Sequence, residues 1–175
     1  RQIKEAISTF EPEKRKEISF PITLNNVIKI ADDNYFTKLK ATTIKEWFDN
    51  GLIQYNFESQ REPRYRRDQS GSLIPEPKIY KESVEQIAEL FIKGELISSV
   101  LTFNARLGTS DEGQELIYDE DEMTLTITKG TLLDSLDGFH RINGIVNALT
   151  THPDANDMYF KVDILNYHVT QAREY

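Results

Sequence analysis

The sequence contains no cysteine, and this absence removes several kinds of chemistry at once. Disulfides, thiolate nucleophiles and cysteine-ligated zinc are all excluded. Histidine is also scarce, with only His140, His152 and His168, and their spacings match no helical metal-binding motif. We therefore expect no metal site built from these residue types.

Long apolar runs are missing as well. The chain has no run of 18 apolar residues and no signal-peptide pattern, so we expect a cytoplasmic protein without a membrane partner. Positive charge is in the minority, because 21 Lys and Arg face 29 Asp and Glu and give a formal net charge of −8. Such a balance argues against indiscriminate binding to nucleic acid, but it permits a local basic surface.

The chain has 175 residues, of which 38% are hydrophobic and 29% are charged. A domain of this size buries roughly 70% of its unfolded surface, so a real core is expected. The first residue is Arg1 rather than Met, and Tyr175 ends a segment with helical character. We therefore expect an excerpt of a longer protein, truncated at its C-terminus.

Hydrophobic periodicity predicts a mixture of helices and strands. Capping-box spacings at Thr43 with Glu46 and at Ser83 with Gln86 predict two helix starts, and Trp47 is expected in the core. A third helix is expected over Ile142–Leu149. Strands are expected over Leu52–Phe57, Leu96–Phe103, Met123–Thr128, Leu132–Leu136 and Tyr159–Leu165, with Lys129-Gly130 as a tight hairpin between the third and the fourth.

Other segments have little regular patterning. Ser59–Gly71 is rich in arginine and predicts a loop, Ser72–Lys78 predicts an extended linker, and Asp111–Glu122 predicts a solvated acidic loop. The elements do not alternate regularly, which is typical of an α+β domain with a small mixed sheet flanked by helices. We expect an N-terminal helical segment over residues 1–50, packed on or leading into a domain over residues 51–175.

The segment from Leu132 to Leu149 predicts a strand-to-helix junction near Gly138. Free N–H groups at a helix start favour an anion, and glycine permits a turn and a close approach. Arg141 adds a planar fork of donors, and His140 adds a group that can change protonation near neutral pH. The alternative is a plain turn with a surface arginine and a histidine that caps locally.

The residues Asp137-Gly138-Phe139-His140-Arg141 resemble the DGQHR motif of DndB-like proteins, with Phe139 in place of glutamine. An upstream Asn-x-x-x-Gln-Arg box, from Asn56 to Arg61, precedes the motif in the order seen in ParB/sulfiredoxin-like domains. The resemblance implies a ParB/sulfiredoxin-like fold in which this junction holds nucleotide phosphates. Sulfiredoxin activity is excluded, because Phe139 stands where that family has its reactive cysteine.

Three functions remain open at this stage. The first is a phosphate-ligand binding regulator of a bacterial or phage DNA modification or defence system, as the resemblance to DndB-like proteins implies. The second is a Mg-dependent nucleoside triphosphatase or nuclease, in which Asp137 and His140 would be catalytic. The third is an interaction module with an acidic surface.

We expect a nucleotide or DNA as the ligand, with Mg²⁺ as a potential cofactor and a protein partner or second copy of the chain as further candidates. The expected phosphate-binding residues are Gln60, Arg61, Arg64, Gly138, His140, Arg141 and Asn143.

Overall fold

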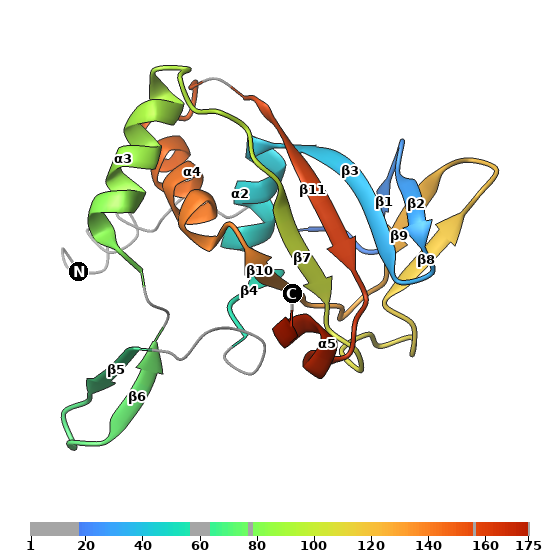
Figure 1. Cartoon of the computed structure of the whole chain (residues 1–175), viewed down its shortest axis with the longest axis horizontal. Coiled ribbons are helices and arrows are strands. Elements are labelled where there is room, and N and C mark those ends of the chain that lie inside the picture. Colours follow the sequence, from blue (N-terminus) through green and yellow to red (C-terminus); the bar gives the residue numbers. More distant parts are fainter. Residues whose placement is uncertain (1–17, 57–63, 77–78, 156, 175) are drawn as a thin grey trace, which may run out of the picture.

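The computed structural model describes residues 18–56, 64–76, 79–155 and 157–174. Over these residues the chain has an α+β fold, as the sequence predicts (Figure 1). The helices are α2 (Ala41–Asp49), α3 (Lys81–Ile92), α4 (Phe139–Thr151) and α5 (Val169–Glu174). The strands are β1 (Ile22–Leu24), β2 (Ile28–Ala31), β3 (Asn34–Lys40), β4 (Ile53–Gln54), β5 (Arg64–Arg67), β6 (Leu73–Glu76), β7 (Leu101–Ala105), β8 (Leu116–Asp119), β9 (Thr124–Ile127), β10 (Leu133–Asp137) and β11 (Tyr159–Leu165).

The largest sheet has six strands in the order β2-β3-β11-β7-β10-β4. Two neighbouring pairs, β11 with β7 and β10 with β4, are parallel, and the other three pairs are antiparallel. The ladder between β3 and β11 runs from Lys40 opposite Tyr159 to Asn34 opposite Leu165. The sheet is therefore mixed, as predicted.

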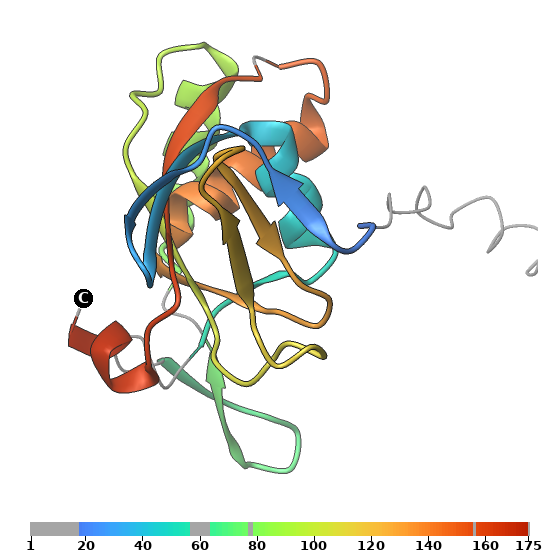
Figure 2. The same cartoon turned by 90° about the vertical axis from the view of Figure 1, so that its right-hand side faces the viewer.

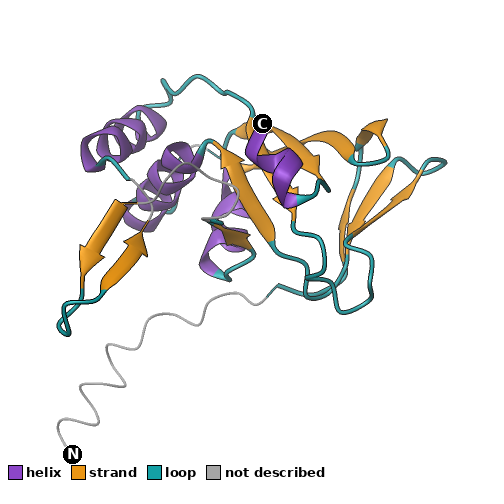
Figure 3. Ribbon diagram, turned by 60° about the horizontal axis from the view of Figure 1, so that its bottom comes forward, coloured by secondary structure: helices purple, strands orange, loops and turns teal. Residues whose placement is uncertain are grey.

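Two smaller sheets accompany the main one. β1, β9 and β8 form a three-stranded antiparallel sheet, and β5 pairs with β6 in a two-stranded hairpin. Figure 3 shows this hairpin as a separate ribbon beside the helices, away from the six-stranded sheet.

The six-stranded sheet separates the helices into two groups. Helices α2, α3 and α4 lie on one side of it, and the short α5 lies on the other (Figure 2). Ile44 of α2 and Ile145 of α4 are completely buried in one core with Phe103 of β7 and Ile164 of β11, which are partners in the parallel ladder. Trp47, at 3% exposure, belongs to the same core, as expected.

The N-terminal part of the chain differs from the expected helical segment. Its described residues form β1, β2 and β3, and only α2 is helical. Tyr35, Thr37 and Leu39 are buried at alternate positions, which is the period of a strand. In the sequence this alternation is hard to recognise, because one of the buried positions is a threonine and the exposed positions include lysines. The main sheet takes strands from both sides of the boundary placed at residue 50.

The predicted hairpin between Met123 and Leu136 is wrong. A turn does occur at Gly130, whose φ is +87°. However, β9 pairs with β1 and β8, whereas β10 pairs with β7 and β4. The turn passes the chain from one sheet to another, and a local turn signal does not specify the partner strand.

Two other segments carry more structure than predicted. The arginine-rich loop and the following linker contain β5 and β6, with an ion pair of 3.2 Å between Arg66 Nε and Glu76 Oε2. The acidic segment contains β8, and Glu115 is only 3% exposed. In both segments the chain pairs as β-strands, although the polar composition predicts a loop.

Both predicted capping boxes are wrong, because α2 begins at Ala41 and α3 at Lys81, ahead of Thr43 and Ser83. Neither helix has a side-chain cap from its own N-cap residue. Distant side chains replace them: the Asp157 carboxylate accepts from the Thr42 N–H at 3.0 Å. Caps supplied by tertiary contacts have no local sequence signal.

Candidate functional site

β10 leads into α4 through Asp137 and Gly138. Gly138 has the left-handed conformation φ +91°, ψ +17°, and it immediately precedes the helix. A Cβ atom there would lie 2.5 Å from Cδ2 of Leu101, a completely buried side chain of β7. Glycine is required both for the backbone conformation and for the close approach. The predicted strand-to-helix junction at Gly138 is confirmed.

The first turn of α4 presents backbone donors. The Ile142 N–H donates to the Gly138 carbonyl at 2.9 Å. The N–H groups of Phe139, His140 and Arg141 precede this bond and have no carbonyl to reach within the helix. The turn contains no acidic residue, and Gly138 offers no side-chain cap. This end of the helix therefore has the electrostatics that favour an anion.

Arg141 lies beside these donors and is anchored at one atom. Its Nη1 donates to the carbonyl oxygen of Ile97 at 2.8 Å. Ile97 lies before β7 and is 82% exposed. The strand was predicted to begin at Leu96, but β7 begins only at Leu101. The other guanidinium donors make no hydrogen bond within the described part of the chain. The anchor fixes one side of the fork and leaves the other side for a ligand.

His140 is oriented by α3. Its Nε2 accepts from the Tyr80 backbone N–H at 3.0 Å, and its ring stacks on the Tyr80 ring with centroids 5.5 Å apart. Because Nε2 accepts, the neutral imidazole carries its proton on Nδ1, which is then a donor. The Asp137 carboxylate, by contrast, is exposed and makes no hydrogen bond among the described residues. His140 therefore caps the start of α3, which is a tertiary contact rather than the local cap weighed as the alternative.

Phe139 and Asn143 stabilise the start of the helix. The Phe139 ring contacts the Tyr55 ring, with centroids 4.9 Å apart and planes tilted by 54°. Asn143 Nδ2 donates to the Phe139 carbonyl at 2.8 Å, one turn back. Phe139, which replaces the glutamine of the motif, thus has a packing contact with the segment after β4.

The remaining predicted ligands cannot be placed at this junction. Gln60 and Arg61 lie outside the described residues, and for Arg64 only the backbone, in β5, is described. Phosphate binding by these side chains therefore stays a prediction.

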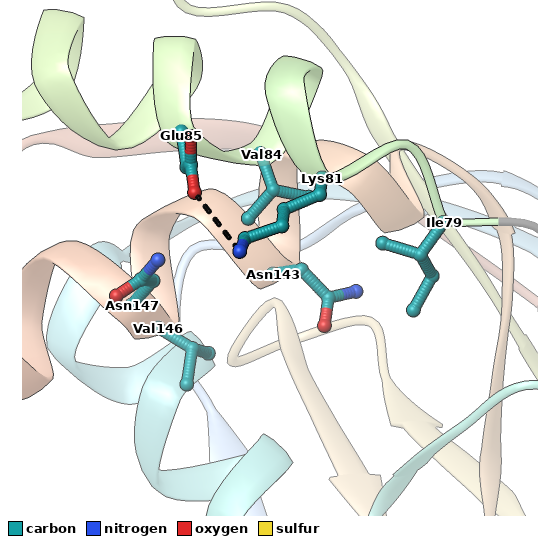
Figure 4. Close-up of a pocket in the computed structure, with 7 residues that line it drawn as sticks. All are labelled: Ile79, Lys81, Val84, Glu85, Asn143, Val146 and Asn147. Carbon is teal, nitrogen blue, oxygen red and sulfur yellow. Dashed lines mark ion pairs between the residues drawn. The ribbon is translucent and has the colours of Figure 1, made fainter.

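A groove between α3 and α4 adjoins the junction (Figure 4). It has a volume of ≈ 340 Å³, and Asn143 and Val146 of α4 line it together with Val84 of α3. At its mouth the Lys81 ammonium lies 3.8 Å from the Glu85 carboxylate. Lys81 is a cation near the motif that sequence reasoning missed, because a single lysine at a helix start gives no signal of its own.

A second polar cavity lies on the opposite face of the sheet. Asp134 of β10 is 1% exposed, and Arg106 Nε lies 3.1 and 3.0 Å from its two carboxylate oxygens. Asn56 Nδ2 donates to the same carboxylate at 2.9 Å. A cavity of ≈ 190 Å³ opens beside these groups and extends to Tyr167 and His168.

This second cluster also eluded sequence reasoning. The available signal was a lone aspartate inside the apolar strand around Leu133, since a buried carboxylate needs a partner. The sequence did not identify Arg106 as that partner. Asn56, the first residue of the predicted Gln-Arg box, is bonded to Asp134 rather than placed at the motif.

Two searches of the described residues were negative. No three His, Asp or Glu side chains among them gather closely enough to hold a metal ion. No helix within those same ranges is long and apolar enough to cross a bilayer.

Comparison with known proteins gives one informative relative. No protein-family model matches the chain, and no solved structure matches it. The SPbeta prophage-derived uncharacterized protein YopQ of Bacillus subtilis (strain 168) is 43% identical over 177 residues. The match takes in 99% of this chain and 38% of YopQ, so the chain spans about two fifths of that relative's length.

Proposed function

We propose that the junction between β10 and α4 binds a phosphate group of a nucleotide or of DNA. The observation that carries this proposal is the first turn of α4, which has N–H groups without a helical partner and also carries Arg141, whose guanidinium is anchored at one atom. Helix dipole, backbone donors and a planar cation act together on one anion. The Nδ1–H of His140 adds a further donor.

We further propose a DndB-like regulator of a bacterial or phage DNA modification or defence system, with a ParB/sulfiredoxin-like fold. The resemblance of Asp137-Gly138-Phe139-His140-Arg141 to the DGQHR motif supports this assignment. YopQ is prophage-derived, and this relative favours a phage setting.

Binding is favoured over turnover by the roles of two residues. A nucleoside triphosphatase or nuclease would use Asp137 to hold Mg²⁺ and His140 to transfer a proton. His140 Nε2 is already bonded to Tyr80, and the motif supplies only one carboxylate for the metal. The remaining alternative, an acidic interaction module, would rely on residues such as Asp119 and Glu122 instead.

A thermal-shift measurement tests the phosphate site. Nucleoside triphosphates should raise the melting temperature, and Arg141→Ala should abolish that rise. Arg141→Lys should retain only part of it, because lysine keeps the charge but loses the planar fork. Arg173→Ala, on α5 across the sheet, is the matched control and should keep the full rise.

Equal stabilisation of the wild-type chain and Arg141→Ala would reject the site. Release of inorganic phosphate that depends on Mg²⁺ and on Asp137 would instead establish the enzymatic alternative. Circular dichroism of each variant verifies that the fold is intact.

A further inference from the structure

We propose that the open face of β3 and β11 binds single-stranded nucleic acid, independently of the α4 junction. Residues directly opposite in an antiparallel ladder share a face of the sheet. Lys40 lies opposite Tyr159, and Lys38 lies opposite Lys161. All four side chains are exposed, on the face opposite the buried Thr37, Leu39, Phe160 and Val162. We refer to Lys38, Lys40, Tyr159 and Lys161 as the lysine face.

Positive charge predominates on the lysine face. None of its three lysines forms an ion pair within the described ranges. Like charges directly opposite each other, such as Lys38 and Lys161, destabilise a sheet. A carboxylate, Asp163, lies further along the same face, opposite Phe36. A positive cluster of this kind, in a chain of net charge −8, is complementary to an anionic partner.

Tyr159 points to a nucleic acid as that partner. The residue is 47% exposed, and Lys38 Nζ and Lys40 Nζ lie 4.3 Å and 5.7 Å from the centroid of its ring. An exposed aromatic ring among cations is the arrangement by which proteins stack a base while neutralising the adjacent phosphates. Phe36 and the 48% exposed Ile28 continue the face as apolar neighbours.

A single strand fits this surface better than a duplex or an acidic protein. In a duplex the base faces are stacked on one another and cannot reach Tyr159, whereas a single strand exposes them. An acidic peptide would use the lysines and leave the ring without a role.

The face is also accessible. α5 lies on the same side of the sheet, but it follows the C-terminal end of β11, whereas Tyr159 begins that strand (Figure 2). Among the residues that the structure describes, no helix therefore covers β11 and β3 at the end that carries the lysines (Figure 1).

Fluorescence anisotropy with a labelled oligothymidylate and the 175-residue chain tests the proposal. The wild-type chain should bind at low salt. Lys38→Gln and Lys161→Gln should each weaken binding and should each reduce the slope of log affinity against log salt concentration by about 0.7. Tyr159→Ala should weaken binding by about 5- to 150-fold, the range expected for one stacked base, and Tyr159→Phe should restore it.

Two controls separate this surface from other sites. Lys93→Gln removes a lysine at the end of α3, on the other side of the sheet, and should leave the affinity unchanged. The lysine-face variants should keep the nucleotide-induced thermal shift, because they leave the α4 junction unchanged. The two proposals can therefore fail separately.

Three results would overturn the proposal. The first is no binding by the wild-type chain at low salt, and the second is equal binding by all variants. The third is efficient competition by polyglutamate together with no effect of Tyr159→Ala, which would identify an acidic protein surface as the partner.

Discussion

At the residue scale, the position of the α4 N-terminus depends on the contact between Gly138 and Leu101. The left-handed backbone of Gly138 turns the chain from β10 into the helix, and the missing side chain leaves room for Leu101. Gly94 also has a positive φ, of +71°, but a Cβ there would meet nothing within 4 Å. Substitutions at the two glycines therefore distinguish the energetic cost of backbone strain from that of steric overlap.

Gly138→Ala should lower the free energy of unfolding by about 2–4 kcal/mol, because left-handed strain and overpacking of a core add together. Gly94→Ala should lower it by about 1–2 kcal/mol, from the strain alone. Urea unfolding of both variants measures the difference. Equal losses would show that Leu101 yields to the added methyl group at no cost.

The residue-level prediction succeeded where chemistry was local. Gly138 was identified because a turn between a strand and a helix needs a permissive backbone, and α4 follows at the expected place. The partners of His140 and Asp134 were not predictable, because Tyr80 and Arg106 lie 60 and 28 residues away in sequence. Only the folded chain brings such groups together.

At the scale of elements, α3 and α4 cross at Gly144. A Cβ atom on Gly144 would lie 2.5 Å from Cγ2 of Ile87 and 3.2 Å from the carbonyl oxygen of Val84. The backbones of the two helices therefore approach closely at this point. The groove beside the junction has walls formed by the same two helices.

Gly144→Ala should destabilise the protein by about 1–3 kcal/mol, because overpacking outweighs the gain of about 1 kcal/mol in helix propensity. Ile87→Ala removes the obstructing methyl group. The double variant should therefore lose less stability than the sum of the single variants. Urea unfolding of all three variants gives the coupling, and simple additivity would contradict the close crossing.

Element prediction was accurate where the hydrophobic period was clear. β11 has the predicted bounds, and α4 contains the predicted helix with short extensions at both ends. β3 was missed because Lys38 and Lys40 interrupt the apolar pattern on the exposed side of the strand. The pairing of β9 and β10 with strands remote in sequence was likewise absent from any local pattern.

At the scale of the whole molecule, the Asp134 carboxylate connects three separate parts of the sheet. It lies on β10, accepts from Arg106 directly after β7, and accepts from Asn56 shortly after β4. The Asp134 side chain is 1% exposed, and that of Arg106 is 34% exposed. Removing the arginine would leave a buried charge with less compensation.

Arg106→Ala should lower the free energy of unfolding by about 2–4 kcal/mol, somewhat below the usual range for a fully buried pair because Arg106 is partly exposed. Lys93→Ala, which breaks the exposed pair with Glu89, should lower it much less, because exposed ion pairs contribute little to stability. Chemical denaturation of both variants compares the pairs. A small loss for Arg106→Ala would mean that solvent compensates Asp134.

The contact between Gly138 and Leu101 also bears on how an anion would be bound. Leu101 is completely buried in β7, which lies between β11 and β10 in the six-stranded sheet. The start of α4 is therefore held against the most interior strands of the protein rather than on a free loop. The backbone donors there are preorganised, so binding costs little conformational entropy, and more of the interaction energy with a ligand appears as affinity.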